Sequence, residues 1–201
     1  MSLDFYSEKE EENNRAESIN EYKYLFSNYE NNPLSLSEAL IQMFESCKLD
    51  NNEVKELTED ILNKSKESID SNFDAIKKKY NNITKEDTYT IFSYTYESKE
   101  REYSPFRILN QNLVSDDLKI GINNVSKYLY LFLKALRKLP KYYPKNKYFY
   151  RCLTINVGTS KEPNNEKIMP YIAGNIKKFL GFISVSPDPK NILLFFKKRR
   201  K

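Results

Sequence analysis

The sequence predicts an α+β fold in which helices come first and strands follow. Two observations support this prediction. Up to Pro140, apolar residues recur every three or four positions, which is typical of amphipathic helices. After Pro140 the apolar segments become short and aromatic, which favours β-strands. We expect three regions: an acidic, disordered segment at 1–30, a folded domain at 34–196 and a basic tail at 197–201.

The first predicted helix begins at Ser35, because Ser35 and Glu38 have capping-box spacing. The apolar residues that follow at helical spacing are Leu36, Ala39, Leu40, Met43 and Phe44. The Asn51-Asn52 pair then ends this helix. A longer helix is predicted from about residue 53 to residue 80, on the apolar series Val54, Leu57, Ile61, Ile69, Phe73, Ile76 and Tyr80.

Three more helices are predicted before Pro140. One begins at Thr84, with an inner face made of Thr88, Ile91, Phe92 and Thr95. The next begins at Ser104-Pro105, where serine caps the helix and proline takes its first position. Its inward residues are Phe106, Leu109 and Leu113. The last covers about residues 124–138, on the stripe Val125, Tyr128, Leu129, Phe132, Leu133 and Leu136, and Pro140 ends it.

The strands are predicted in the remaining third of the chain. Residues 147–154 and 182–186 read as strands, separated by a polar loop at 160–167. Residues 192–196 read as a third strand or as the start of a helix.

Composition excludes several kinds of catalytic site. The chain has no histidine, so a Ser-His or Cys-His nucleophile pair cannot form. Its two cysteines, Cys47 and Cys152, are too far apart in sequence for a typical zinc motif, and we expect no metal. The four glycines do not form a Gly-rich phosphate loop.

The charge and hydropathy patterns indicate location and partners. The formal net charge is +5, with an acidic start and the basic run Lys197–Lys201. No apolar run is long enough to cross a bilayer, so we expect no membrane association. We therefore expect a cytoplasmic protein, and the basic tail leaves nuclear import open.

Several segments carry a family resemblance when they are taken in order. Residues 83–95 form one of the predicted helices, and 128–138 form another that runs into Leu139-Pro140. Arg151 follows in the aromatic stretch 148–153, and Gly181 precedes Phe182-Ile183-Ser184-Val185-Ser186. In this order the segments resemble the arginine-type (R-S-E class) mono-ADP-ribosyltransferases. The resemblance implies an N-terminal helical region followed by part of that family's split antiparallel sheet.

The resemblance also implies a function and a site. Family members cleave NAD, which is a substrate, and transfer ADP-ribose to an exposed arginine of a target protein. By this resemblance Arg151 would hold the phosphate-ribose part of NAD with its rigid fork of donors. Ser184 would be the catalytic serine and would also contact NAD, and Ser186 would be a further cofactor-binding residue. No metal is implied.

One family motif is missing. Family members carry a Glu-x-Glu pair on a later strand, and its carboxylate stabilises the oxocarbenium-like transition state. After Ser186 the sequence has one acidic residue, Asp188, between two prolines. Cys152 also stands where relatives usually have glycine. We therefore expect this chain to be truncated or inactive as a transferase.

An alternative function remains open from the sequence. The chain would then be a non-catalytic helical interaction protein whose basic tail binds acidic partners or nucleic acid. No recognisable single-strand-binding motif accompanies the tail, so nucleic acid is the less favoured partner. The oligomeric state does not follow from the sequence.

Overall fold

A computed structural model describes residues 27, 29–30, 33–115, 117–140 and 182. The chain divides into two compact units, Met1–Pro140 and Lys141–Lys201. Nearly all the described residues belong to the first unit, and Phe182 is the described residue of the second. The predicted strands therefore lie outside the described residues, apart from Phe182. Residues 1–26 and the predicted basic tail also lie outside them.

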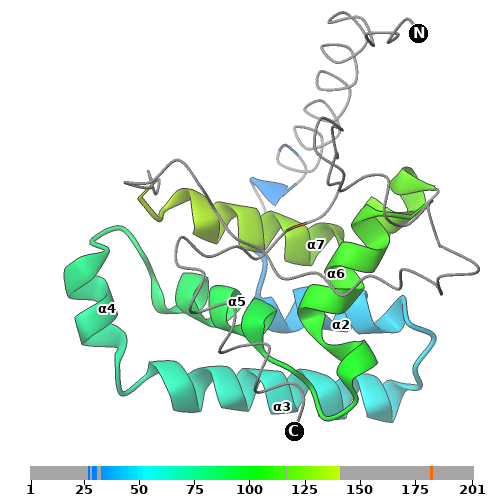
Figure 1. Ribbon diagram of the computed structural model, residues 1–201, viewed down its shortest axis with the longest axis horizontal. Coiled ribbons are helices and arrows are strands. Elements are labelled where there is room, and N and C mark those ends of the chain that lie inside the picture. The colour runs from blue at the N-terminus through cyan, green and yellow to red at the C-terminus, as the bar shows by residue number, and fades with distance from the viewer. Residues whose placement is uncertain (1–26, 28, 31–32, 116, 141–181, 183–201) are drawn as a thin grey trace, which may run out of the picture. The chain divides into compact units, whose positions relative to one another are not determined.

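The first unit is built from six described α-helices and one short 3-10 helix (Figure 1). In chain order they are α2 (Leu36–Glu45), α3 (Asn51–Ile69), α4 (Phe73–Lys79), α5 (Lys85–Thr95), η1 (Arg101–Tyr103), α6 (Pro105–Leu113) and α7 (Leu118–Arg137). Helix α7 packs on α2, α5 and α6, whereas α3 packs on α2 and α5. In Figure 1, α7 and α3 accordingly lie on opposite sides of the layer formed by α2 and α5.

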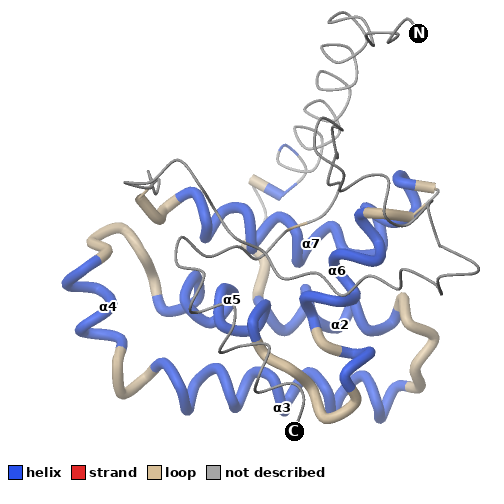
Figure 2. Tube along the Cα trace, in the orientation of Figure 1, coloured by secondary structure: helices blue, strands red, loops and turns tan. Residues whose placement is uncertain are grey.

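The prediction of an α+β fold is wrong for the part of the chain that the structure describes. Every described regular element is a helix, and Figure 2 shows these helices in blue with no strand among the described residues. The expected split antiparallel sheet rested on β-propensity in the segments after Pro140. Strand propensity depends on cross-strand neighbours and is a weak guide by itself. The core of the described unit is closed by helix–helix packing instead.

Two predicted helix starts are confirmed by their capping boxes. Ser35 forms one with Glu38 at the start of α2, and Thr84 forms another with Asp87 at the start of α5. Helix α6 begins at Pro105 as predicted, but the Ser104 side chain makes no capping hydrogen bond and accepts one from the Ser98 amide at 3.1 Å instead.

The role predicted for Asn51-Asn52 is wrong, because these residues do not end the first helix. Helix α2 already ends at Glu45, and Asn51-Asn52 are the first residues of α3. The Asp50 side chain before them accepts hydrogen bonds from the amides of the first turn. These contacts satisfy amide groups that an α-helix leaves open at its start.

The single helix predicted from 53 to 80 is wrong, because the structure has two helices there. A turn separates Ile69 at the end of α3 from Phe73 at the start of α4. In this turn the Asn72 side chain donates a hydrogen bond to the Ser68 carbonyl, at 3.2 Å. Asparagine side chains that bond to nearby carbonyls compete with helix continuation. Helix α4 has no buried residue, and it lies at one end of the unit (Figure 1).

Helix α7 begins six residues earlier than predicted. Its N-cap is Asp117, which accepts a hydrogen bond from the Ile120 amide at 3.0 Å. Gly121 then lies against α6, where a Cβ atom would come within 2.1 Å of the Asn112 carbonyl oxygen. Only glycine allows the two backbones to approach this closely.

The core lies mainly between α2, α5, α6 and α7. Four residues of the predicted α7 stripe are buried: Val125, Tyr128, Leu129 and Phe132. The predicted inner face of α5 is correct only in part. Thr88 is buried, but Thr95 is exposed, and the other inward positions are the polar residues Asp87, Thr90 and Ser93. The face of α5 toward the core is therefore largely polar.

Candidate functional site

The residues expected to bind NAD lie outside the described residues. These are Arg151, Ser184 and Ser186. Their neighbour Phe182 is described and is partly buried. The structure does describe two of the segments that carry the family resemblance, because residues 83–95 include α5 and residues 128–140 include the second half of α7. These two helices pack directly against each other.

The first link between them is an ion pair. Lys138 Nζ donates to Asp87 Oδ2 at 2.6 Å. The same carboxylate accepts from the Thr84 amide at 2.8 Å and from the Thr84 hydroxyl at 2.7 Å. Asp87 thus caps the start of α5 and also holds the last turn of α7. A lysine at a helix C-terminus and an aspartate at a helix N-terminus both interact favourably with the helix dipoles.

The electrostatics of Asp87 favour its charged form. Its side chain is 9% exposed, and burial acts to raise the pKa of the carboxyl. The hydrogen bonds from Lys138 and Thr84 act in the opposite direction and outweigh burial, so the pKa of Asp87 is lowered. A carboxylate held in this way is a hydrogen-bond acceptor at neutral pH and a poor general acid.

The second link is a buried hydroxyl pair in the middle of the two helices. Tyr128 Oη lies 2.8 Å from Ser93 Oγ, and Ser93 donates to the Thr90 carbonyl at 2.8 Å. Either hydroxyl can donate in the Ser93–Tyr128 pair, and Tyr128 Oη also lies 3.5 Å from the Thr90 carbonyl oxygen. Tyr128 is fully buried, and burial raises the pKa of its phenol despite the opposing effect of Ser93. The phenol therefore stays protonated and can donate a hydrogen bond.

A third polar contact holds α2 to α7. Gln42 Nε2 donates to the Asn123 carbonyl at 3.1 Å, and Gln42 Oε1 accepts from the Lys127 amide at 3.1 Å. Asn123 and Lys127 are four positions apart, so one carboxamide contacts both members of a helical i, i+4 pair. Ser126, which lies next to Gln42 Nε2 at 3.2 Å, also bonds to Tyr29 at 2.8 Å.

Two open hollows lie on the described surface. The larger has a volume of about 420 Å³ and is lined by Ser46, Cys47, Glu102, Tyr103, Ile108, Gln111 and Asn112. Burial raises the pKa of the Cys47 thiol, which disfavours its nucleophilic thiolate form. The smaller, of about 300 Å³, lies along α2 and α3 and includes Thr58, whose buried hydroxyl has no hydrogen-bond partner among the described residues.

Neither a metal site nor a membrane span is found in the described ranges. Among these residues, no three His, Cys, Asp or Glu side chains are grouped so that they could hold a metal ion. The described helices are also too short or too polar for any of them to cross a bilayer.

Most of this polar framework could not be predicted from the sequence. The start of α5 at Thr84 was predicted, but the pairing of Asp87 with Lys138, 51 residues later, was not. Tyr128 was expected in an apolar stripe, and Gln42 had no predicted role. Repeated Thr and Ser at helical spacing in α5 were the available signal, because an inward polar face needs partners on the facing helix.

Comparisons with known proteins give no relative for this chain: no family model, curated protein or solved structure matches it.

Proposed function

We propose that this chain is an arginine-type mono-ADP-ribosyltransferase-like protein that binds NAD but is inactive as a transferase, because the family's Glu-x-Glu motif is missing after Ser186. At the family level, exposed arginine side chains of other proteins are the acceptors. One observation carries the proposal. The two described segments that resemble this family, 83–95 and 128–140, pack against each other and are joined by Asp87–Lys138 and Ser93–Tyr128. Segments that resemble one family are expected to be neighbours in space if the resemblance reflects a shared domain.

The order of these segments along the chain also supports the proposed function. The first compact unit ends at Pro140, and the segment that contains Arg151 begins a few residues later. In the family resemblance, a helix ending in Leu-Pro comes directly before the arginine-bearing segment. The proposed roles are that Arg151 holds the phosphate-ribose part of NAD, that Ser184 orients the nicotinamide ribose and that Ser186 is a further cofactor-binding residue. Arginine is suited to this role because its planar donors match phosphate oxygens.

Titration of NAD into the purified full chain by isothermal calorimetry tests the proposal. We expect saturable binding, and we expect Arg151→Lys to weaken it at least about tenfold, since a hydrogen bond to a charged group contributes roughly 1.5–3 kcal/mol. Ser184→Ala should weaken it less. The matched controls are Arg101→Lys and Ser160→Ala, which should bind as the original chain does. Absence of saturable binding, or equal losses in variants and controls, would contradict the proposal.

A second candidate function has one observation in its favour. Residues 141–201 contain 14 Lys and Arg against three Asp and Glu, whereas the described helical unit is nearly balanced, with 16 against 17. Such an excess favours polyanion binding by the second unit. A binding constant for a DNA duplex that falls steeply with salt, together with no NAD binding, would support this function over the first.

A further inference from the structure

The charges of the described helical unit divide between its two ends. We define the cationic end as the last turns of α3, all of α4, the first turn of α5 and the last turn of α7. It holds nine basic residues, which are Lys64, Lys66, Lys77, Lys78, Lys79, Lys85, Lys134, Arg137 and Lys138. The same turns hold five acidic ones, Glu67, Asp70, Asp74, Glu86 and Asp87. The rest of the described unit has the opposite balance, seven basic against 12 acidic.

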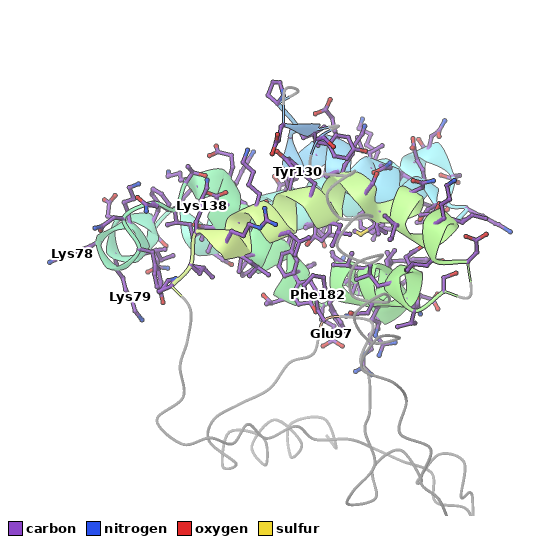
Figure 3. All side chains as sticks on the ribbon, turned by 90° about the horizontal axis from the view of Figure 1, so that it is seen from above. Lys78, Lys79, Glu97, Tyr130, Lys138 and Phe182 are labelled. Atoms are coloured by element: carbon purple, nitrogen blue, oxygen red, sulfur yellow. The ribbon has the colours of Figure 1, made fainter. Side chains whose placement is uncertain are left out.

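Contacts between the helices show that this end is one continuous surface. Lys138 joins the end of α7 to Asp87 at the start of α5. Lys85, also at the start of α5, bonds to Asp70 after α3 at 3.2 Å and lies over the ring of Phe73 in α4. Figure 3 shows Lys78 and Lys79 on α4 and Lys138 on α7 at the same end of the unit.

Four lysines of the cationic end are available to a partner. Three pairs are internally neutralised: Lys64–Glu67, Lys85–Asp70 and Lys138–Asp87. Lys77 has no ion pair among the described residues, but its ammonium donates to the carbonyls of Asn81 and Ile83 at 2.6 and 3.2 Å. The remaining lysines without an ion-pair partner among the described residues are Lys66, Lys78, Lys79 and Lys134, and the carboxylates without one are Asp74 and Glu86. The surface therefore offers four cations against two anions.

The chemistry of this surface favours an acidic protein segment over nucleic acid or a bilayer. The aromatic rings next to the lysines are already covered, because Lys79 lies over Tyr80 at 5.2 Å and Lys85 over Phe73 at 5.6 Å. Stacking of bases on these rings is thus disfavoured. Phe73, Ile76 and Tyr80 are each partly buried against the unit and do not form an apolar face for insertion into lipid.

The positions of the two carboxylates that lack an ion-pair partner among the described residues also favour a protein partner over nucleic acid. Asp74 and Glu86 stand among the lysines and would repel an unbroken row of phosphates, whereas a protein segment can place a basic or neutral residue opposite them. We propose that the cationic end, centred on Lys78 and Lys79 of α4, is a docking surface for an acidic segment of a partner protein. This surface belongs to the first unit and is independent of the residues proposed to bind NAD.

Fluorescence anisotropy with the full chain and a labelled ten-residue peptide of alternating glutamate and serine tests this proposal, because such a peptide can place serine opposite Asp74 and Glu86. We expect the double charge reversal Lys78→Glu/Lys79→Glu to raise the dissociation constant about fivefold, because each exposed ion pair contributes roughly 0.2–1 kcal/mol. The matched control is Lys99→Glu/Lys119→Glu, which makes the same change in net charge at two exposed lysines outside the cationic end. It should change the dissociation constant less than about twofold.

Three outcomes would overturn the proposal. Equal weakening in both variants would mean that net charge, and not this surface, determines binding. No measurable binding of the peptide by the original chain would remove the surface as a docking site. A short DNA duplex that loses more affinity than the peptide on Lys78→Glu/Lys79→Glu would assign the surface to nucleic acid. Circular dichroism and thermal unfolding should be unchanged in both variants, because both lysine pairs are exposed.

Discussion

Lys138 donates a 2.6 Å hydrogen bond to Asp87, and this bond joins the last turn of α7 to the first turn of α5. Asp87 is 51 residues before Lys138 in the chain, and its side chain is almost completely buried. Asp87 also completes the capping box of α5 with Thr84. One carboxylate thus stabilises both a local helix start and a contact between distant segments.

Replacing Lys138 with methionine should lower the free energy of unfolding by about 1–3 kcal/mol, because the buried Asp87 carboxylate loses a charged partner. Urea denaturation at pH 7 measures the change. Lys119→Met is the control, since Lys119 is exposed and forms no ion pair among the described residues. Equal stability of Lys138→Met and the original chain would show that the pair contributes nothing.

Replacing Gly121 with alanine should destabilise the protein by about 1–3 kcal/mol, because the new Cβ would overlap the Asn112 carbonyl. In an unobstructed helix interior the same substitution would stabilise by about 1 kcal/mol. The sign of the change in melting temperature therefore decides whether α6 and α7 approach as closely as described. Asn123→Ala, at an exposed position of the same helix, should be nearly neutral.

Replacing Gln42 with alanine should lower the free energy of unfolding by about 1–2 kcal/mol, because α7 loses the hydrogen bonds at Asn123 and Lys127. Hydrogen exchange of the amides near Lys127 should also become faster. Gln111→Ala is the matched control at an exposed position. An unchanged exchange rate in Gln42→Ala would show that the carboxamide does not hold α7.

Stability should fall as the pH rises from about 10 to 12, because two tyrosines lose favourable contacts with carboxylates. The hydrogen bond to Asp70 raises the pKa of Tyr89 to about 12, and burial with the hydrogen bond to Asp60 raises the pKa of Tyr96 to about 12. The unfolded tyrosines ionise near 10, so the unfolded state loses its protons first. The stabilisation is complete below pH 10 and disappears as the pH passes 12.

Urea denaturation between pH 9 and pH 11.5 measures this loss, where the limits are chosen around the ordinary tyrosine pKa of about 10. The double variant Tyr89→Phe/Tyr96→Phe should show a flatter dependence of unfolding free energy on pH, since it has two fewer phenols to ionise. A slope identical to that of the original chain would show that these phenols ionise alike in the folded and unfolded states.

Features of the fold that depend on neighbouring residues were predicted better than features that depend on residues far apart in the sequence. Helix starts at Ser35 and Thr84 were predicted correctly, because a capping residue acts on amides two or three positions away. The start of α6 was predicted correctly because Pro105 suits the first helical position. The break between α3 and α4 was missed, because apolar residues continue through it at helical spacing. The α+β fold class was wrong for the described residues, because it was inferred from local strand propensity, which is a weak guide by itself.

The candidate NAD-binding residues came from the sequence alone and stay predictions, since Arg151, Ser184 and Ser186 lie outside the described residues. The cationic end could not be predicted in this way. Its lysines come from four helices, and only their packing brings Lys78 of α4 and Lys138 of α7 to the same end. Charge along a sequence does not reveal charge on a surface.

The sequence by itself determined where three of the six described α-helices begin, namely α2, α5 and α6. It also determined the buried apolar residues of α2 and four of those in α7. Periodicity and capping are local, so neighbouring residues suffice to specify them. The tertiary structure alone decided that Asp87 meets Lys138, that Tyr128 forms a hydrogen bond with Ser93 and that Gly121 lies against Asn112. Such pairs depend on how whole helices pack, and no spacing within a single helix encodes them.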